Sequence, residues 1–322
     1  MNFRRQKHRA RLKFFISGML RYLLPSWPCR RHFERQLAEL TPEKRAYIDD
    51  RVNYYLRLPR GARLPEGVGV RLRDFRFPWR AKNRHSAYFL DLYEAVCIGR
   101  PDDRFAYIFG DLTEEAPYPA FVKSRPITDG PTNSVLLKLN SVRHYQFVRD
   151  ELTWEQKEPR VVFRAEVHQP HRREFLRRWF GHPLVNAGQI NSDEAEDPRW
   201  VQPFMPVEEQ LRYKFVATIE GNDVATSLKW VMGSNSLALM PRPRIESWFM
   251  EGRLEPGVHY VEVRPDYSDL EEKVQYYLEH PAEAQAIIEN AHAWIKQFQD
   301  QQRERLIGRM VAESYFGQVG RV

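Results

Sequence analysis

The 322-residue chain contains 42% hydrophobic and 29% charged residues, a globular composition that excludes a mostly disordered or collagen-like protein. Its two cysteines, Cys29 and Cys97, are too few for a disulfide framework or a four-cysteine zinc site, and they favour a reducing compartment. No apolar run reaches the roughly 18–20 residues that span a bilayer. The length predicts two domains of about 150 residues each.

The positive charge is concentrated at the N-terminus. Residues 1–33 carry nine Lys and Arg and no acidic residue, whereas the rest of the chain has a net charge of −2. Apolar residues alternate with these bases, which predicts an amphipathic helical arm that lies on an anionic membrane surface; packing of the arm on its own core is the alternative. Because the body is nearly neutral, no nucleic-acid partner is expected. We predict a cytoplasmic protein, peripheral on the inner face of the cytoplasmic membrane.

The first half of the chain shows helices and one clear strand. A helix is predicted over 37–58, with a start signal at Thr41-Pro42, where a capping residue precedes a proline. A second helix is predicted over 85–98. The apolar run 105–109 that follows reads as a buried strand.

Strand–loop–helix units follow from residue 160 onward. Strands are predicted at 161–164, 183–185, 213–219, 236–240 and 258–263, and helices at 171–179, around Lys229, and at 270–278 and 281–298. This alternation predicts an α/β protein with a parallel sheet covered on both faces. Two such halves, 34–155 and 156–298, would face each other across a cleft. A polar link near 150–160 marks their boundary, and the segment 299–322 is expected to pack back on the first half.

Two segments at predicted strand ends contain candidate binding residues. Arg164 ends one strand, and the next helix begins with Gln169-Pro170-His171-Arg172. Arginines beside the backbone N–H groups of a helix start suit a diphosphate, although a basic surface helix has the same pattern. In the loop 220–227, Gly221 permits close backbone approach and Asn222 or Asp223 can cap the following helix, so phosphate binding and simple capping both fit.

Asp111 follows the strand at 105–109 and is a candidate general base for an acceptor hydroxyl; a surface-turn carboxylate is the alternative. The sequence has no GxGxxG, GxxxxGK[ST] or GxSxG motif, which argues against nicotinamide, P-loop and serine-hydrolase chemistry. The ten histidines show no metal-ligand spacing, so no metal site is predicted.

Taken in order, these segments resemble glycosyltransferase family 90, which includes capsule-associated transferases, protein O-glucosyltransferases and bacterial lipopolysaccharide core transferases. The resemblance is closest to the bacterial lipopolysaccharide branch and runs from about residue 85 to the C-terminus. It rests on the segments 107–111, 123–127, 133–139, 163–172, 220–230, 248–252, 259–260 and 267–273.

The resemblance implies a GT-B fold of two Rossmann-like domains, with 34–155 on the acceptor side and 156–298 holding the nucleotide sugar. It implies inverting transfer from a nucleotide sugar without a required metal. No cofactor is expected, and a UDP-sugar is the expected donor. By the same resemblance Asp111 is the catalytic base and Arg172 contacts the donor diphosphate. Arg164, a second positive group at the same strand end, is expected to help stabilise the diphosphate leaving group. The other implied donor-binding residues are Gln169, Asn222, Asp223, Val224, Ala225, Thr226, Ser227 and Lys229.

Arg125, Lys138 and Glu251 are second-rank candidates, for the acceptor or for the diphosphate charge. Eukaryotic members of the family carry Arg where Ser227 stands, and Gly-Ser where Ala165-Glu166 stand, so the donor's identity is not carried over from them.

The function expected from the sequence is transfer of a sugar to a lipopolysaccharide or related glycolipid acceptor. The alternatives are the same chemistry on a capsular or protein acceptor, and a non-catalytic nucleotide- or sugar-binding module.

Overall fold

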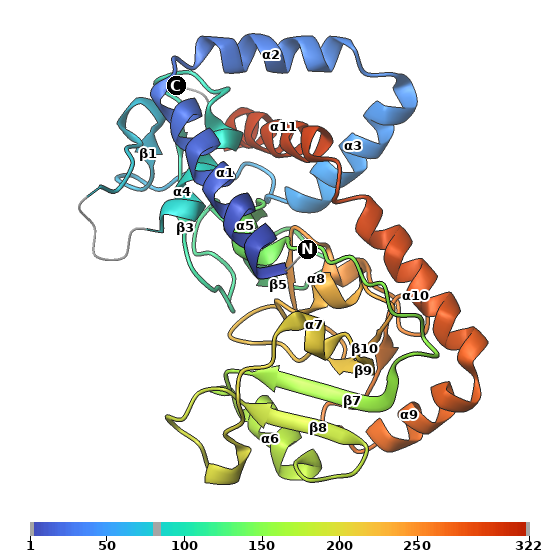
Figure 1. Cartoon of the computed structure of the whole chain (residues 1–322). Coiled ribbons are helices and arrows are strands. Elements are labelled where there is room, and N and C mark those ends of the chain that lie inside the picture. Colours follow the sequence, from blue (N-terminus) through green and yellow to red (C-terminus); the bar gives the residue numbers. More distant parts are fainter. Residues whose placement is uncertain (1–2, 80–84, 320–322) are drawn as a thin grey trace. The chain divides into compact units, whose positions relative to one another are not determined.

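The computed structural model describes residues 3–79 and 85–319, with side chains from residue 8 onward. The chain forms two compact units (Figure 1). Unit 1 consists mainly of Tyr145–Arg244 and Met250–Phe298, and unit 2 mainly of Arg5–His144, Ile245–Phe249 and the chain from Gln299 onward. Residues 1–2 of the predicted arm and 320–322 of the predicted C-terminal segment lie outside the described residues.

Unit 1 is built around a five-stranded parallel sheet, which confirms the predicted α/β class. Its strands lie in the order β12-β10-β9-β7-β8, and every neighbouring pair is parallel. The bounds are β7 Glu158–Ala165, β8 Val185–Gln189, β9 Tyr213–Ala217, β10 Leu237–Met240 and β12 Val261–Glu262.

Three helices cover one face of this sheet: α6 Pro170–Trp179, α9 Leu270–Glu279 and α10 Pro281–Lys296. Alternate strand residues such as Val161 and Phe163 join the same buried core as Phe175 of α6 and Val274 of α9, as the two-residue period of a strand requires. Short elements complete the unit: η2 Pro198–Trp200, α7 Val207–Gln210, α8 Leu228–Val231 and η3 Glu251–Arg253.

In the segment 150–160, predicted as a polar link, Asp150 and Lys157 form a buried ion pair inside unit 1, while most of the other residues are exposed. The Lys157 ammonium lies 2.7 Å from the Asp150 carboxylate, and both side chains are almost fully buried. The same carboxylate accepts a hydrogen bond from the backbone N–H of Asn235. Sequence could not show this, because the partner lies 85 residues away.

Unit 2 contains three small sheets. A parallel sheet joins β3 Tyr107–Ile108, β4 Ala120–Val122 and β6 Ser134–Leu136. Two antiparallel pairs join β1 Val70–Arg71 to β2 Arg104–Phe105, and β5 Ser124–Pro126 to β11 Ile245–Ser247. The predicted strand at 105–109 is thus divided between β2 and β3. Through β11, residues 245–249, which the sequence assigned to the second domain, belong to unit 2.

Longer helices surround these sheets: α2 Trp27–Ala38, α3 Pro42–Tyr55, α4 Ser86–Val96 and α11 Gln301–Val319, with the short α5 Ser141–His144 and η1 Leu72–Asp74. The single helix predicted over 37–58 is wrong at its start, since residues 39–41 are not helical. The capping signal itself is confirmed, because the Thr41 side chain accepts a hydrogen bond from the backbone N–H of Lys44. In unit 2, α11 packs against α3 and α4 (Figure 1).

The helix α1, Phe3–Leu23, packs on unit 2 with one face. Arg21 forms a 2.6 Å ion pair with Glu94 of α4, and the Tyr22 ring contacts Phe89 and Tyr93 of the same helix. Cys29 of α2 forms a disulfide with Cys97 at the end of α4, a pairing that the sequence did not predict.

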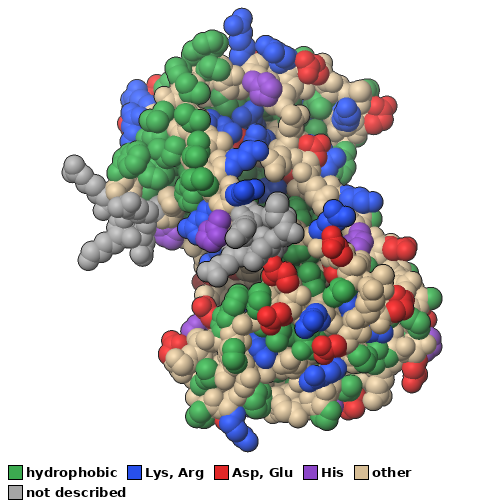
Figure 2. All heavy atoms as spheres, in the orientation of Figure 1, with side chains coloured by type: hydrophobic (Ala, Val, Ile, Leu, Met, Phe, Trp, Pro, Cys, Tyr) green, Lys and Arg blue, Asp and Glu red, His purple; other side chains and the backbone are tan. Residues whose placement is uncertain are grey.

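The other face of α1 is exposed. Hydrophobic side chains gather in Figure 2 over the region where α1 and the start of α2 lie, with Lys and Arg side chains close by. The large exposed hydrophobic residues there are Leu12, Ile16, Leu20, Leu23, Leu24 and Trp27. Across residues 3–79 and 85–319, no helix has both the length and the apolar character needed to cross a membrane.

Candidate active site

The order of the strands in unit 1 creates a candidate binding site at one edge of the sheet. After β7 the chain moves to β8 on one side, and then returns to β9 on the other side of β7. The carboxyl ends of β7 and β9 therefore form a topological switch point, where the following loops diverge and open α/β sheets bind ligands. The loop that follows β7 contains Gln169 and leads into Arg172 in the first turn of α6, and the loop that follows β9 contains the segment 219–227.

Arg172, in the first turn of α6, lies between these two loops. Its Nη1 donates to the carbonyl of Glu166 after β7, and its Nε and Nη2 donate to the carbonyls of Glu220 and Ile219 after β9. These contacts use three of its five N–H groups. Burial lowers the pKa of Arg172 to about 10, so the group stays cationic at neutral pH without a carboxylate partner in these contacts.

A hydrogen bond between Gln169 and Asn222 joins the same two loops. The Gln169 amide nitrogen donates to the Asn222 side-chain oxygen at 2.6 Å. A Cβ atom on Gly221 would lie 3.3 Å from Nη2 of Arg172, which explains the glycine by close approach of the guanidinium. In the rest of the loop, Asp223, Val224 and Ala225 are buried while Thr226 and Ser227 are partly exposed.

Arg164 is not brought to this group. Its guanidinium donates to the backbone and side-chain oxygens of Asn186 on β8, so it lies against the neighbouring strand. Lys229 is also held elsewhere. It forms a buried 2.6 Å ion pair with Glu251, and both side chains are almost fully covered. In the structure, Arg164, Lys229 and Glu251 therefore make contacts within the fold, away from Arg172.

Asp111 lies in unit 2 beyond the carboxyl end of β3, after Gly110, whose φ of +112° favours glycine. It forms an ion pair with Lys123, which follows β4. Because β3 and β4 are parallel, both residues lie at the same edge of the small sheet. The Lys123 side chain is buried and that of Asp111 is 34% exposed, so the carboxylate is fixed by its partner and remains accessible.

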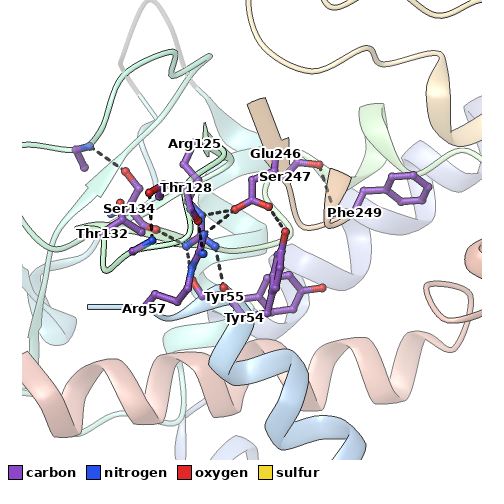
Figure 3. A network of polar contacts seen from close by, with 12 residues as sticks. Tyr54, Tyr55, Arg57, Arg125, Thr128, Thr132, Ser134, Glu246, Ser247 and Phe249 are labelled. Carbon is purple, nitrogen blue, oxygen red and sulfur yellow. Dashed lines mark hydrogen bonds and ion pairs between the residues drawn. The ribbon is translucent and has the colours of Figure 1, made fainter. Parts of the chain in front are cut away.

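Arg125 and Lys138 lie in buried networks of unit 2. Figure 3 shows Arg125 against Glu246 of β11, with Tyr54 and Arg57 on the same carboxylate. Arg125 and Glu246 are fully buried. Lys138 lies 3.6 Å from Glu304, and burial lowers the pKa of its ammonium. Both basic side chains therefore pair with buried carboxylates of the protein itself.

Three residues of the unit 1 edge were not predicted as site residues. His171 and Glu220 occur in the motifs, but nothing local shows that the His171 ring nitrogen Nε2 donates to the Glu220 carbonyl. Arg244 follows β10, and its position just past a predicted strand is a signal that could have identified it. Among the described residues, no group of three or more His, Cys, Asp or Glu side chains could hold a metal ion.

Comparison with known proteins identifies the family of the chain. The model of the family described as "Glycosyl transferase family 90" matches residues 135–303. The "O-glucosyltransferase LpsA" of Dichelobacter nodosus is 42% identical over 319 residues, covering 97% of this chain and 96% of that protein. "Protein O-glucosyltransferase 3" of Homo sapiens is 29% identical over 140 residues, covering 42% of this chain and 27% of that protein.

The parallel sheet of unit 1 places the chain among the α/β proteins, in which ligands bind at a switch point of the sheet. Within that class, the chain belongs to glycosyltransferase family 90 and is a glycosyltransferase.

Proposed function

We propose that this glycosyltransferase transfers a glucosyl group, with inversion, from a nucleotide sugar to a hydroxyl group of a lipopolysaccharide or related glycolipid. The observation that carries the donor site is the position of Arg172 at the switch point of β7 and β9. The names of the relatives, both O-glucosyltransferases, support glucose as the sugar and oxygen as the acceptor atom. The expected nucleotide is a uridine diphosphate.

In the proposed reaction, the acceptor oxygen attacks the anomeric carbon while the bond from that carbon to the diphosphate breaks. The hydroxyl proton passes to the Asp111 carboxylate, and the nucleoside diphosphate leaves with the bonding electrons. The two remaining N–H groups of Arg172, with the Gln169–Asn222 pair beside them, offset the charge that grows on the leaving group.

The exposed face of α1 supports peripheral attachment to an anionic membrane, where a lipid-linked acceptor is found. Leu12, Ile16 and Leu20 are each more than half exposed and recur every fourth residue, so they form one stripe. Arg9, Arg11 and Lys13 nearby are exposed. An apolar stripe with basic flanks is the pattern of a helix lying in the bilayer interface. The opposite face packs on α4, so attachment and packing use different faces.

The test is transfer and donor binding in wild type and Arg172→Ala. Calorimetry with UDP, GDP and ADP should give binding to one nucleotide, and Arg172→Ala should weaken it by about 10-fold to 100-fold, as expected for a lost charge-assisted hydrogen bond. Wild type should release that nucleotide from its glucose conjugate when a glycolipid acceptor is added. Binding without any transfer or hydrolysis would favour the alternative, a non-catalytic nucleotide-binding module.

A further inference from the structure

Arg244 reaches the edge of the unit 1 sheet from a third strand. It follows β10. The neighbouring strand β9 leads into the loop whose carbonyl groups bind Arg172. Its side chain is 72% exposed, so most of the guanidinium faces solvent. A cation in this position has no role in the core of the sheet.

Glu220 binds both Arg172 and Arg244, the first through its backbone carbonyl and the second through its carboxylate. One of its carboxylate oxygens accepts the backbone N–H of Arg244 at 2.9 Å, and the other accepts Nε of the Arg244 side chain at 3.2 Å. Its carbonyl oxygen accepts Nε of Arg172 and Nε2 of His171, both at 2.8 Å. A single residue after β9 thus orients the first turn of α6 and the segment after β10.

The electrostatic surroundings agree with this clustering. Burial is the largest cause of the lowered pKa of His171, and the charges of Arg244 and Arg172 lower it further, against the raising effect of the Glu220 carbonyl hydrogen bond and carboxylate. The charges of both arginines also lower the pKa of the buried Tyr267 phenol, against the larger raising effect of burial. The two arginines therefore lie near the same residues, and the single carboxylate of Glu220 neutralises only part of their charge.

We propose that Arg244, oriented by Glu220, is a second arginine that binds the diphosphate of the donor together with Arg172. The inference rests on the proposed function, because it assumes that the sheet edge receives a nucleoside diphosphate. Nε of Arg244 donates to Glu220, and the side chain is 72% exposed, so its outer Nη1 and Nη2 edge can reach a ligand from solvent. That edge offers the two parallel N–H groups that match phosphate oxygens.

The experiment is calorimetric binding of UDP and of UMP to wild type, Arg244→Ala and a matched control, Arg242→Ala. Arg242 is two residues away, equally exposed at 70%, and paired with Glu262 instead. We expect Arg244→Ala to weaken UDP binding by about 10-fold to 100-fold and UMP binding less, because UMP lacks the second phosphate. Arg242→Ala should bind UDP as wild type does.

Two results separate this inference from the proposed function. If UDP binds wild type and Arg172→Ala loses it while Arg244→Ala and Arg242→Ala do not differ, the inference is overturned and the donor site stands. If wild type binds neither UDP nor any other nucleoside diphosphate, the proposed function fails first. Equal weakening in Arg244→Ala and Arg242→Ala would also overturn the inference, since general surface charge would then explain it.

His171 provides a readout that a purely structural role would not move. In NMR titration, UDP should raise the pKa of His171 in wild type, because phosphate charge offsets the two arginines. In Arg244→Ala the pKa of free His171 should be higher than in wild type, and its rise with UDP smaller. An unchanged His171 pKa in this variant would contradict the shared site.

Discussion

Asp111 gives the sharpest prediction for a single residue. Its carboxylate is fixed by Lys123 and accessible. Asp111→Asn keeps the shape but cannot take the acceptor proton, so the transfer rate should fall by about 100-fold to 10,000-fold while the Kd for UDP is unchanged. Single-turnover transfer and calorimetry measure the two quantities.

Asp102→Asn is the matched control for this prediction. Asp102 is an exposed carboxylate paired with Arg73 at 2.9 Å, near the start of β2, and its substitution should leave transfer intact. A wild-type rate in Asp111→Asn would remove Asp111 from the role of base.

Asp91 of α4 gives a pH-dependent stability. Burial raises the pKa of this carboxyl group to about 7, although two hydrogen bonds from Ser141 act in the opposite direction. The folded state therefore binds the proton more tightly than the unfolded chain does, so the free energy of unfolding should rise as the pH falls from about 7 towards the unfolded pKa near 4. The residue is partly exposed, which reduces the size of the effect.

Urea unfolding of wild type and Asp91→Asn between pH 5 and 8 would check this. The variant, which cannot ionise, should lose most of the slope in this window. Parallel slopes in the two proteins would assign the pH dependence to other groups.

At the residue scale, the sequence predicted Asp111 just after a strand and Arg172 at the start of the helix that follows a strand, and both lie there in the structure. Their chemical roles stay predictions. It could not foresee that Lys229 and Arg125 are held by Glu251 and Glu246, because a buried ion pair depends on partners brought together only by folding.

At the scale of elements, the contact between the end of α4 and α11 gives opposite predictions for two glycines. A Cβ on Gly99 would lie 2.9 Å from the buried Phe316 ring of α11, whereas one on Gly317 would meet nothing within 4 Å. Gly99→Ala should lower the free energy of unfolding by about 1–3 kcal/mol through overpacking. Gly317→Ala, on the exposed side of α11, should raise it by about 0.5–1 kcal/mol.

Urea unfolding measures both changes, and each variant controls for the other. Equal stability of Gly99→Ala and wild type would show that Phe316 does not pack closely there.

The elements that sequence predicted well are those with strong local signals. The helices α4, α6, α9 and α10 have clear periodicity or a proline at their start, and each lies within a few residues of its predicted range. The strands β4, β5, β6 and β11, of three residues each, are too short to show an alternation, and they were not predicted.

At the scale of the whole molecule, the membrane proposal depends on the exposed face of α1. The double variant Ile16→Asn/Leu20→Asn should reduce binding to vesicles containing anionic phosphatidylglycerol by about tenfold or more, since it removes two apolar side chains from the interface. Its solubility and unfolding midpoint should hold, because both side chains are exposed. Cosedimentation with vesicles at low and high salt measures the binding.

Phe204→Asn is the control, because Phe204 is 73% exposed in unit 1 and outside the arm. Binding should also weaken with salt, because screening reduces the attraction of the basic residues. Vesicle binding of the double variant equal to that of wild type would exclude α1 as the attachment site.

The amino-acid sequence by itself determined the α/β class, the positions of the longer helices, the strand ends that carry the candidate residues, and the family. These features depend on residue periodicity, capping and local motifs, which act between neighbours along the chain. Only the tertiary structure decided that Glu220 joins Arg172 to Arg244, that the Asp150 carboxylate binds the backbone of Asn235, and that β11 pairs with β5. Each depends on contacts between segments far apart in the sequence, such as the 121 residues between Arg125 and Glu246, and no local pattern encodes them.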